Sequence, residues 1–186
     1  MRGMPEPTDE DLLDRAGRSE AAFMLLFERH REAIFRVAYR LTNSAAAAED
    51  ITQECFLGLL HAPERFDPAK GSLRTYLYGA VRNHARKYHG LREGTVDLDD
   101  SEIGEAPEPS RLLLQQELSQ LIQQAISTLP VPQREALVLS QYEELPLDEI
   151  ALILGVDVGA VKSRLHRARA RLRRILTPYF QGSTAR

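Results

Sequence analysis

Residues 146–176 read PLDEIALILGVDVGAVKSRLHRARARLRRIL. Apolar residues recur in this stretch at steps of three and four, the spacing that places them on one face of an α-helix. The pattern breaks at Gly155, which readily adopts the left-handed conformation that ends a helix, and it resumes after Asp157, a favourable N-cap residue. The stretch therefore predicts two amphipathic helices joined by a tight turn, the helix-turn-helix arrangement. The expected buried stripes are Leu147, Ile150, Ala151 and Leu154 in the first helix, and Val158, Val161, Leu165, Ala168, Leu172 and Ile175 in the second.

The second of these helices carries a concentrated positive charge, because residues 162–174 hold seven Lys or Arg and no acid. With the apolar stripe turned into a core, the cations are expected to cover the exposed arc: Lys162, Arg164, Arg167, Arg169, Arg171, Arg173 and Arg174. Neighbouring like charges repel one another on a helix, and a polyanion that releases its condensed counterions turns that repulsion into binding. The pattern favours a helix that enters the major groove of DNA by its amino-terminal half. A solvated basic helix is the alternative.

The net charge of the whole chain, -3 over 186 residues, hides this asymmetry. Residues 1–92 hold 14 bases and 13 acids, residues 93–110 hold no base and seven acids, and residues 111–186 hold 10 bases and seven acids. The acidic segment 93–110 also contains two Pro and two Gly, which is typical of a flexible, self-repelling linker. Two mildly basic blocks around an acidic linker indicate a polyanionic partner.

The block before the linker predicts three helices. Ser19, Ser44 and Ser72 are the candidate N-caps, and residues 61–71, with two Pro and a Gly, separate the second helix from the third. Strand-like alternation is absent from the sequence, so the expected fold class is all-α. The expected apolar positions are Phe23, Leu26, Phe27, Ile34, Val37, Ala38 and Leu41, then Ala48, Ile51, Cys55 and Leu59, then Leu73, Leu77, Ala80, Val81, His84 and Tyr88.

The block after the linker predicts four helices, of which the last two form the helix-turn-helix. Ser110 is expected to cap the first, Pro130 and Pro132 mark its end, and residues 133–142 form the next. The expected organisation is a tail over residues 1–18, a helical domain over 19–92, the linker over 93–110, a second helical domain over 111–178, and a tail over 179–186.

Three segments of the chain resemble a known family, the extracytoplasmic-function (ECF) group of bacterial RNA polymerase sigma factors. Residues 128–172, TLPVPQREALVLSQYEELPLDEIALILGVDVGAVKSRLHRARARL, resemble its promoter-reading region four. Residues 47–58, AAEDITQECFLG, and residues 66–93, FDPAKGSLRTYLYGAVRNHARKYHGLRE, resemble successive parts of its region two. The resemblance covers about residues 20–92 and 112–176. It implies two small helical domains that bind RNA polymerase core and direct it to promoter DNA.

By this resemblance, the second domain reads duplex DNA at the minus-thirty-five element. The positions that match the family's contacts lie early on the basic helix, at Lys162, Ser163, His166 and Arg167, and side chains of these types donate to base edges or phosphates. His166 is either a base contact or simply solvated. The expected surface along this helix also includes Arg164, Arg169, Arg171, Arg173 and Arg174.

By the same resemblance, the first domain opens the minus-ten element and holds its single strand. Single-strand capture needs cations along the backbone and a pocket for an extruded base, which the family forms around residues 63–70. Tyr76 stands where many members have Trp, and Tyr76 and Tyr78 are either packing residues or base-stacking ones. The expected minus-ten residues are Lys70, Arg74, Tyr76, Arg82, Asn83, Arg86 and Lys87.

Asp50, Gln53 and Glu54 share one face of a predicted helix, because they are spaced i, i+3 and i+4. Such a face is usually only solvated, but in the family it docks on the clamp helices of the largest polymerase subunit. The resemblance further implies a contact with the flap of the second-largest subunit, and an anti-sigma factor as another partner.

Enzyme motifs are absent from the sequence: it has no glycine-rich phosphate loop, no GxSxG and no HExxH. His84 and His89 are poorly spaced to share a metal on one helix, and Cys55 lacks a CxxC partner, so it is expected in the core. We therefore expect no catalytic residue, no metal and no cofactor. The longest apolar runs are too short to cross a bilayer and the amino terminus lacks a secretory signal, so we expect a cytoplasmic chain with no membrane insertion.

A stand-alone dimeric helix-turn-helix regulator is the alternative to a sigma factor. It explains residues 147–176 equally well. It does not explain why a second basic helix, residues 73–89, follows the polar face at residues 50–54.

Overall fold

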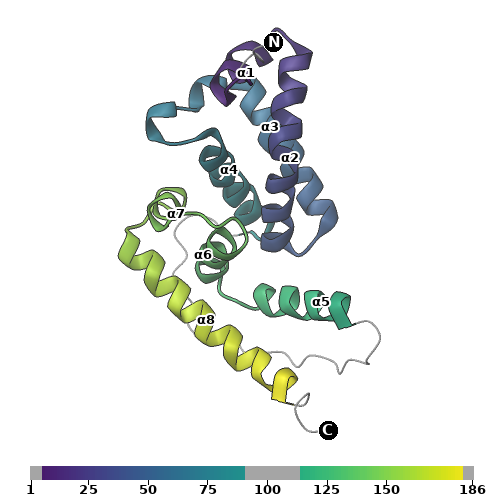
Figure 1. Ribbon diagram of the computed structural model, residues 1–186, viewed down its shortest axis with the longest axis vertical. Helices are drawn as coiled ribbons and strands as arrows, with labels where there is room; N and C mark the ends of the chain where they lie inside the picture. Colours follow the sequence, from purple (N-terminus) through teal and green to yellow (C-terminus); the bar gives the residue numbers. More distant parts are fainter. Residues whose placement is uncertain (1–5, 91–113, 182–186) are drawn as a thin grey trace, which may run out of the picture.

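The computed structural model describes residues 6–90 and 114–181, and within these ranges all regular structure is helical, which confirms the expected fold class. The predicted linker and the predicted cap at Ser110 lie outside the described residues. Figure 1 shows two groups of helices, which we call the N-terminal bundle and the C-terminal bundle. The N-terminal bundle contains α1 (Asp9–Ala16), α2 (Glu20–Thr42), α3 (Ala45–His61), the short turns η1 (Pro63–Arg65) and η2 (Pro68–Lys70), and α4 (Leu73–Tyr88). The C-terminal bundle contains α5 (Leu114–Ser127), α6 (Val131–Gln141), α7 (Leu147–Leu154) and α8 (Val158–Gln181).

Four helices begin at the N-cap residues that the sequence predicts. The hydroxyl of Ser19 accepts a hydrogen bond from the amide of Ala22 at 3.3 Å, and Ser44 and Ser72 accept equivalent bonds at 3.2 Å. The carboxylate of Asp157 accepts one from Ala160 at 2.8 Å. Each cap satisfies an amide that the first turn of a helix leaves unpaired, which explains why α2, α3, α4 and α8 begin where they do.

The stretch predicted as an N-terminal tail contains the helix α1, which is a correction to the sequence-based expectation. Thr8 and Asp11 form a reciprocal capping box at its start. Leu12, Leu13 and Ala16 are buried against the rest of the bundle. The helix is also tied to α2 through Asp9, which accepts hydrogen bonds from Arg29 at 2.6 Å and pairs with the buried His30 at 2.9 Å.

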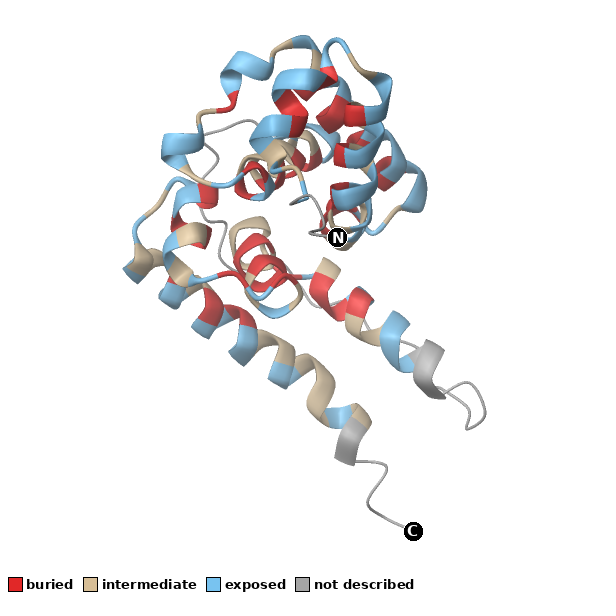
Figure 2. Ribbon diagram, turned by 45° about the horizontal axis from the view of Figure 1, so that its top comes forward, coloured by how far each residue is buried: buried red, intermediate tan, exposed pale blue. Residues whose placement is uncertain are grey.

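The core of the N-terminal bundle is formed by the apolar stripes of α2, α3 and α4, and Figure 2 shows their buried positions facing the middle of the bundle. The predicted stripe of α3, Ala48, Ile51, Cys55 and Leu59, is buried throughout. The prediction for α4 was wrong at Tyr88, which is 55% exposed, and Tyr78 is fully buried instead. The stripe of α4 therefore turns toward Tyr78 and Ala85, because this helix is covered on two sides.

The C-terminal bundle places the predicted helix-turn-helix on its surface. Gly155 ends α7 in the left-handed conformation, with φ 65°, and its amide bonds back to carbonyls of α7, as the sequence predicts. Val161, Leu165 and Ala168 of α8 are buried, while Leu172 packs only partly against the core. The last helix continues to Gln181 and includes Pro178, so it extends into the stretch expected to be a tail.

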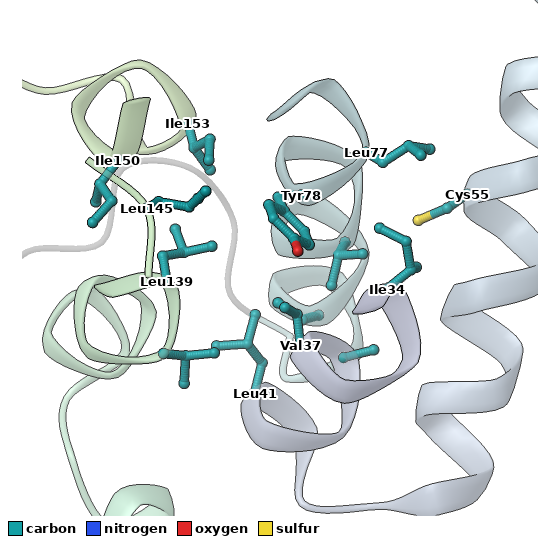
Figure 3. Close-up of a cluster of buried hydrophobic side chains, with 14 of the residues drawn as sticks. Ile34, Val37, Leu41, Cys55, Leu77, Tyr78, Leu139, Leu145, Ile150 and Ile153 are labelled. Atoms are coloured by element: carbon teal, nitrogen blue, oxygen red, sulfur yellow. The ribbon is translucent and has the colours of Figure 1, made fainter. Parts of the chain in front are cut away.

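The two bundles share one continuous hydrophobic cluster. In Figure 3, Leu139 and Leu145 from the C-terminal bundle lie opposite Val37, Leu41 and Tyr78 from the N-terminal bundle. Polar contacts surround this seam: Arg134 of α6 donates to the carbonyl oxygen of Leu41 at 2.8 Å. The two bundles are therefore packed against each other, although the sequence predicts only that a linker joins them.

Candidate nucleic-acid and partner-protein interfaces

The basic face of α8 is turned to solvent on the outer side of the C-terminal bundle (Figure 1). The buried stripe of α8 and the cap at Asp157 fix both the rotation and the starting point of this helix. A helix exposed in this way, preceded by a tight turn, is free to enter a DNA groove. The exposed residues on it are Lys162, Ser163, His166, Arg167, Arg169, Arg173 and Arg174.

Arg164 and Arg171 do not belong to the exposed arc, which corrects the prediction made for them. Both residues are only partly exposed, and Nη1 of Arg164 and Nε of Arg171 are buried. The physical reason is helical geometry: Arg164 follows the buried Val161 by three residues and Arg171 follows the buried Ala168 by three, so both lie on the same flank of the buried face. The other five cations predicted for the arc are exposed as expected.

A hollow of about 370 Å³ runs along one flank of α8. Lys162, His166, Arg169 and Arg173 line it, at successive steps of four, three and four residues, and Ser140 and Leu147 form part of its opposite wall. This arrangement brings an imidazole and three cations to one side of the helix. It suits an anionic strand that follows the helix axis.

The predicted minus-ten residues divide between two faces of α4. On the first face, Tyr76 and Asn83 line a cavity of about 420 Å³ between α3, α4 and the η1–η2 loop, and Lys70 lies at the same cavity. Phe66 packs against Tyr76 with ring centroids 5.8 Å apart. Partial burial raises the pKa of the Tyr76 hydroxyl, so this group stays a neutral donor and acceptor near neutral pH. The cavity has the polar and aromatic lining that a nucleobase requires.

The loop beside this cavity is held by local hydrogen bonds. Asp67 caps η2 by accepting from the amide of Ala69 at 3.0 Å, and Lys70 pairs with it at 3.2 Å. These two contacts lower the pKa of the Asp67 carboxyl. The cation of Lys70 is therefore kept close to the mouth of the cavity while its side chain stays 80% exposed.

On the second face of α4, Arg74, Arg82 and Arg86 contact the C-terminal bundle. Arg86 donates to both carboxylate oxygens of Glu135, at 2.6 and 2.9 Å, and Arg82 donates to the same group at 3.2 Å. Arg74 donates to the carbonyl oxygen of Glu143 at 3.2 Å. Lys87 is exposed beside this face. The structure thus places three arginines that were predicted to bind DNA on one face, where they instead bind carbonyl and carboxylate oxygens of the C-terminal bundle.

Glu135 and Glu143 are functional candidates that the sequence does not reveal. Both carboxylates are buried, each with a side chain only 3% exposed. Glu143 accepts hydrogen bonds from Arg36 of α2, at 3.4 Å, and from the hydroxyl of the buried Tyr78. Burial and this hydrogen bond raise the pKa of Tyr78. A contact between positions 49 or more residues apart leaves no local pattern, so only the fold could identify these partners.

Asp50, Gln53 and Glu54 are all exposed on α3, as predicted. They lie between two hollows: Gln53 lines a groove of about 400 Å³ at the α2–α3 surface, and Glu54 lines the cavity beside Tyr76. The groove has an apolar contribution from two aromatic side chains and a charged rim, which suits a helix of a partner protein. Its other lining residues are Phe27, Arg31, Glu32, Phe35, Glu49 and Thr52.

Cys55 lies in the core, as expected, and burial raises the pKa of its thiol to about 12. Within the described residues no group of His, Cys, Asp and Glu is arranged to hold a metal ion. None of the described helices is long and apolar enough to cross a membrane.

Comparisons with known proteins identify both bundles. The family model for Sigma-70 region 2 matches residues 26–92, and that for Sigma-70, region 4 matches residues 119–172. The chain is 31% identical to the ECF RNA polymerase sigma factor SigE of Mycolicibacterium smegmatis, over 94% of this chain and 70% of that protein. It is also 31% identical to the ECF RNA polymerase sigma-E factor of Escherichia coli, over 87% of this chain and 91% of that protein.

A solved structure shows the same arrangement of helices. CnrH, in complex with the cytosolic domain of CnrY, superposes on this chain with a TM-score of 0.69 at 26% identity, covering 91% of this chain and 97% of CnrH. The matched regions, the full-length relatives and the common fold lead to the same assignment. This chain belongs to the ECF family of RNA polymerase sigma factors.

Proposed function

We propose that this chain directs RNA polymerase core to promoters, with each bundle contacting a different promoter element. One observation carries the proposal: a single chain contains sigma regions two and four in order, and its helix-turn-helix presents a basic helix to solvent. As a member of the ECF family, the chain is a transcription initiation factor whose partners are polymerase core and promoter DNA. Nucleotide addition is assigned to the polymerase, and no catalytic step is assigned to this chain.

The C-terminal bundle is proposed to read the minus-thirty-five element. Lys162, Ser163, His166 and Arg167 lie in the first turns of α8, the half of a recognition helix that reaches base edges. The cations farther along the helix, Arg169, Arg173 and Arg174, contact phosphates, which set position and affinity but not sequence preference. Arg164 and Arg171, held at the flank of the buried face, are proposed to reach the backbone at the edge of the groove.

The N-terminal bundle is proposed to hold the opened minus-ten strand. An extruded base fits the cavity of about 420 Å³, where the amide of Asn83 bonds to its edge and Tyr76 forms part of the wall. Lys70 at the rim neutralises the adjacent phosphate. Arg74, Arg82, Arg86 and Lys87 contact the backbone on either side.

The exposed ridge of α3 is proposed to dock on the clamp helices of the largest polymerase subunit. Asp50, Gln53 and Glu54 supply polar contacts, and the groove beside Gln53 receives an apolar side chain of the partner helix. The C-terminal bundle is proposed to contact the flap of the second-largest subunit. An anti-sigma factor is proposed as the inhibitor, and the cytoplasm as the compartment where these partners meet.

Reconstitution with core polymerase tests the proposed function. The purified chain and core enzyme are mixed, separated by gel filtration, and assayed for run-off transcription on genomic fragments. We expect co-elution and transcripts with discrete 5′ ends that share upstream motifs. A free dimer that binds paired half-sites tightly, with no transcripts from core enzyme, supports the dimeric regulator instead. The family assignment does not favour that second function.

A further inference from the structure

Four arginines of the N-terminal bundle form one surface beneath the C-terminal bundle. Arg36 comes from α2, and Arg74, Arg82 and Arg86 come from one side of α4; we call these four residues the arginine row. Each of the four donates a hydrogen bond to a residue of α6 or of the α6–α7 connection. Arg82 and Arg86 are thus largely covered in this structure, with side chains 14% and 19% exposed, whereas Arg36 and Arg74 stay exposed at the edge of the seam.

Two buried carboxylates occupy the positions at which the row would hold anions. Glu135 accepts three hydrogen bonds, from Arg82 and from two nitrogens of Arg86, and Glu143 accepts from Arg36 and Tyr78. The bidentate fork with which Arg86 holds the Glu135 carboxylate is also the arrangement with which arginine binds two oxygens of a phosphate. The row holds four cations against the carboxylates of Glu135 and Glu143 and that of Glu32, which lies 3.6 Å from Arg36.

The ion pairs between the bundles contribute little to holding them together. Buried ion pairs gain little net stability, because desolvation offsets most of the Coulomb attraction. The seam combines the shared hydrophobic cluster with polar contacts, such as the hydrogen bonds of Gln123 with the carbonyl oxygens of Tyr39 and Arg40. Interfaces of this polarity between domains of one chain permit relative motion.

The C-terminal bundle also forms part of the wall of the cavity beside Tyr76. Leu152 and Ile153 of α7 line that cavity together with residues of α3 and α4. A methyl group of Leu152 lies 3.3 Å from the point where a Cβ atom on Gly71 would be, so α7 reaches the loop itself. The hydroxyl of Thr75 in α4 also donates a hydrogen bond to the carboxylate of Glu149 in α7, at 3.1 Å. One movement of α6 and α7 away from α4 uncovers both the cavity and the arginine row.

We infer that the arginine row is a binding site for the phosphate backbone of single-stranded DNA, and that in the free chain Glu135 masks Arg82 and Arg86 while Glu143 engages Arg36. The inference rests on the proposed function for the identity of the strand. It adds Arg36, on α2, to the residues that contact DNA, and it makes the two glutamates internal competitors of the phosphates. The free chain then binds a single strand only in its open fraction, which lowers the apparent affinity by that fraction.

The test compares full-length chains that differ at the two glutamates. The masked-site variant is the double substitution Glu135→Gln and Glu143→Gln. Its control is the double substitution Glu10→Gln and Glu28→Gln, which removes the same charge from exposed positions away from the seam. Affinity for a fluorescent single-stranded oligonucleotide is measured by anisotropy, and the radius of gyration by small-angle X-ray scattering, with no polymerase present.

We expect the masked-site variant to bind the oligonucleotide roughly tenfold more tightly than the control, the factor for a chain that is open about one tenth of the time. Its radius of gyration should also exceed that of the control. Adding Arg36→Ala to the masked-site variant should weaken binding and reduce the slope of log affinity against log salt by about 0.7, the value for one lost phosphate contact on a single strand. Equal affinity of variant and control, or no loss on adding Arg36→Ala, overturns the inference.

The wild-type chain provides a second test that does not depend on how well the variants fold. Saturating oligonucleotide should increase the radius of gyration of the wild-type protein, because α6 and α7 must leave α4. Binding without expansion overturns the inference. These measurements use no polymerase, so a failure to program core enzyme would overturn the proposed function while leaving the masking result intact.

Discussion

At the scale of single residues, the chain's one cysteine is a buried apolar group. Cys55 is only 3% exposed, and desolvation together with nearby Glu54 raises the pKa of its thiol from 9.0 to about 12. As pH rises above 9, the unfolded chain loses this proton while the folded chain keeps it, so the free energy of unfolding falls. The stabilising contribution is fully present below pH 9 and is lost progressively up to pH 12.

This linkage predicts a difference between wild type and Cys55→Ala. Between pH 8 and pH 10 the wild type should lose about 1 kcal/mol more of its unfolding free energy than the variant, as follows from the two pKa values. Urea unfolding of both proteins at pH 8 and pH 10 measures this difference in unfolding free energy. Parallel pH dependence in the two proteins would show that the thiol titrates normally.

Glu144 is an exposed residue in a left-handed conformation, with φ 52°. A side chain with a Cβ atom is strained there, so Glu144→Gly should raise the unfolding free energy by up to about 1 kcal/mol, less the larger entropy that glycine gains in the unfolded chain. Asn43→Gly is the matched control at φ 55°, where asparagine already tolerates the conformation and the gain should be smaller. Thermal melts of the wild type and the two variants measure both changes in stability. A melting temperature of Glu144→Gly below that of the wild type would contradict the predicted strain at Glu144.

At the scale of elements, the sequence predicts those helices whose signals are local. Ser19, Ser44, Ser72 and Asp157 are cap residues followed by apolar residues at helical spacing, and each cap is formed. The sequence did not predict helix α1, because its eight residues hold only one short apolar patch among several acids, a composition that is typical of a solvated tail. Arg164 and Arg171 were misplaced because a helical pattern locates the middle of the buried face better than its edges.

Position along α8 should separate two kinds of DNA contact. Arg167→Ala, in the first turns, should weaken binding of holoenzyme to promoter DNA by about 1–3 kcal/mol and alter the preference at one base pair. Arg174→Ala, near the end of the basic segment, should weaken binding to all sequences alike and lower the salt slope by about 1. Competition binding with single-base variants of the minus-thirty-five element, repeated at several salt concentrations, measures both. A base-specific effect from Arg174 would reverse the proposed orientation of the helix.

At the scale of the whole molecule, the closed packing of the two bundles is the feature that the sequence least reveals. The polar and apolar character of Glu135, Glu143 and Tyr78 is plain in the sequence, but their partners lie 49 to 107 residues away. No local periodicity encodes a contact at that separation. The sequence therefore proposes the minus-ten residues one by one, whereas their division between a cavity and an arginine surface at the seam required the fold.

The proposed docking site for polymerase is the exposed ridge of α3, formed by Asp50, Gln53 and Glu54. Charge reversal at Asp50 and Glu54, Asp50→Lys with Glu54→Lys, should weaken binding of the chain to core enzyme, because it places cations where the proposed clamp contact requires acids. Glu10→Lys with Asp14→Lys on α1, also exposed, is the matched control. Core affinity by gel filtration or pull-down is the readout, and equal affinity of the two variants would place the polymerase contact elsewhere.

The central claim is that one chain reads two promoter elements with two different bundles, and it is tested most directly by footprinting a single promoter complex. Holoenzyme is assembled with wild type, Arg167→Ala or Asn83→Ala, and the same template is probed with nuclease and with permanganate. We predict that wild type protects the minus-thirty-five element and exposes unpaired thymines at the minus-ten element. Arg167→Ala should lose the upstream protection, and Asn83→Ala should keep it while losing the thymine reactivity. Loss of both signals by the same degree in both variants, or no opened thymines with wild type, would contradict the division of function between the bundles.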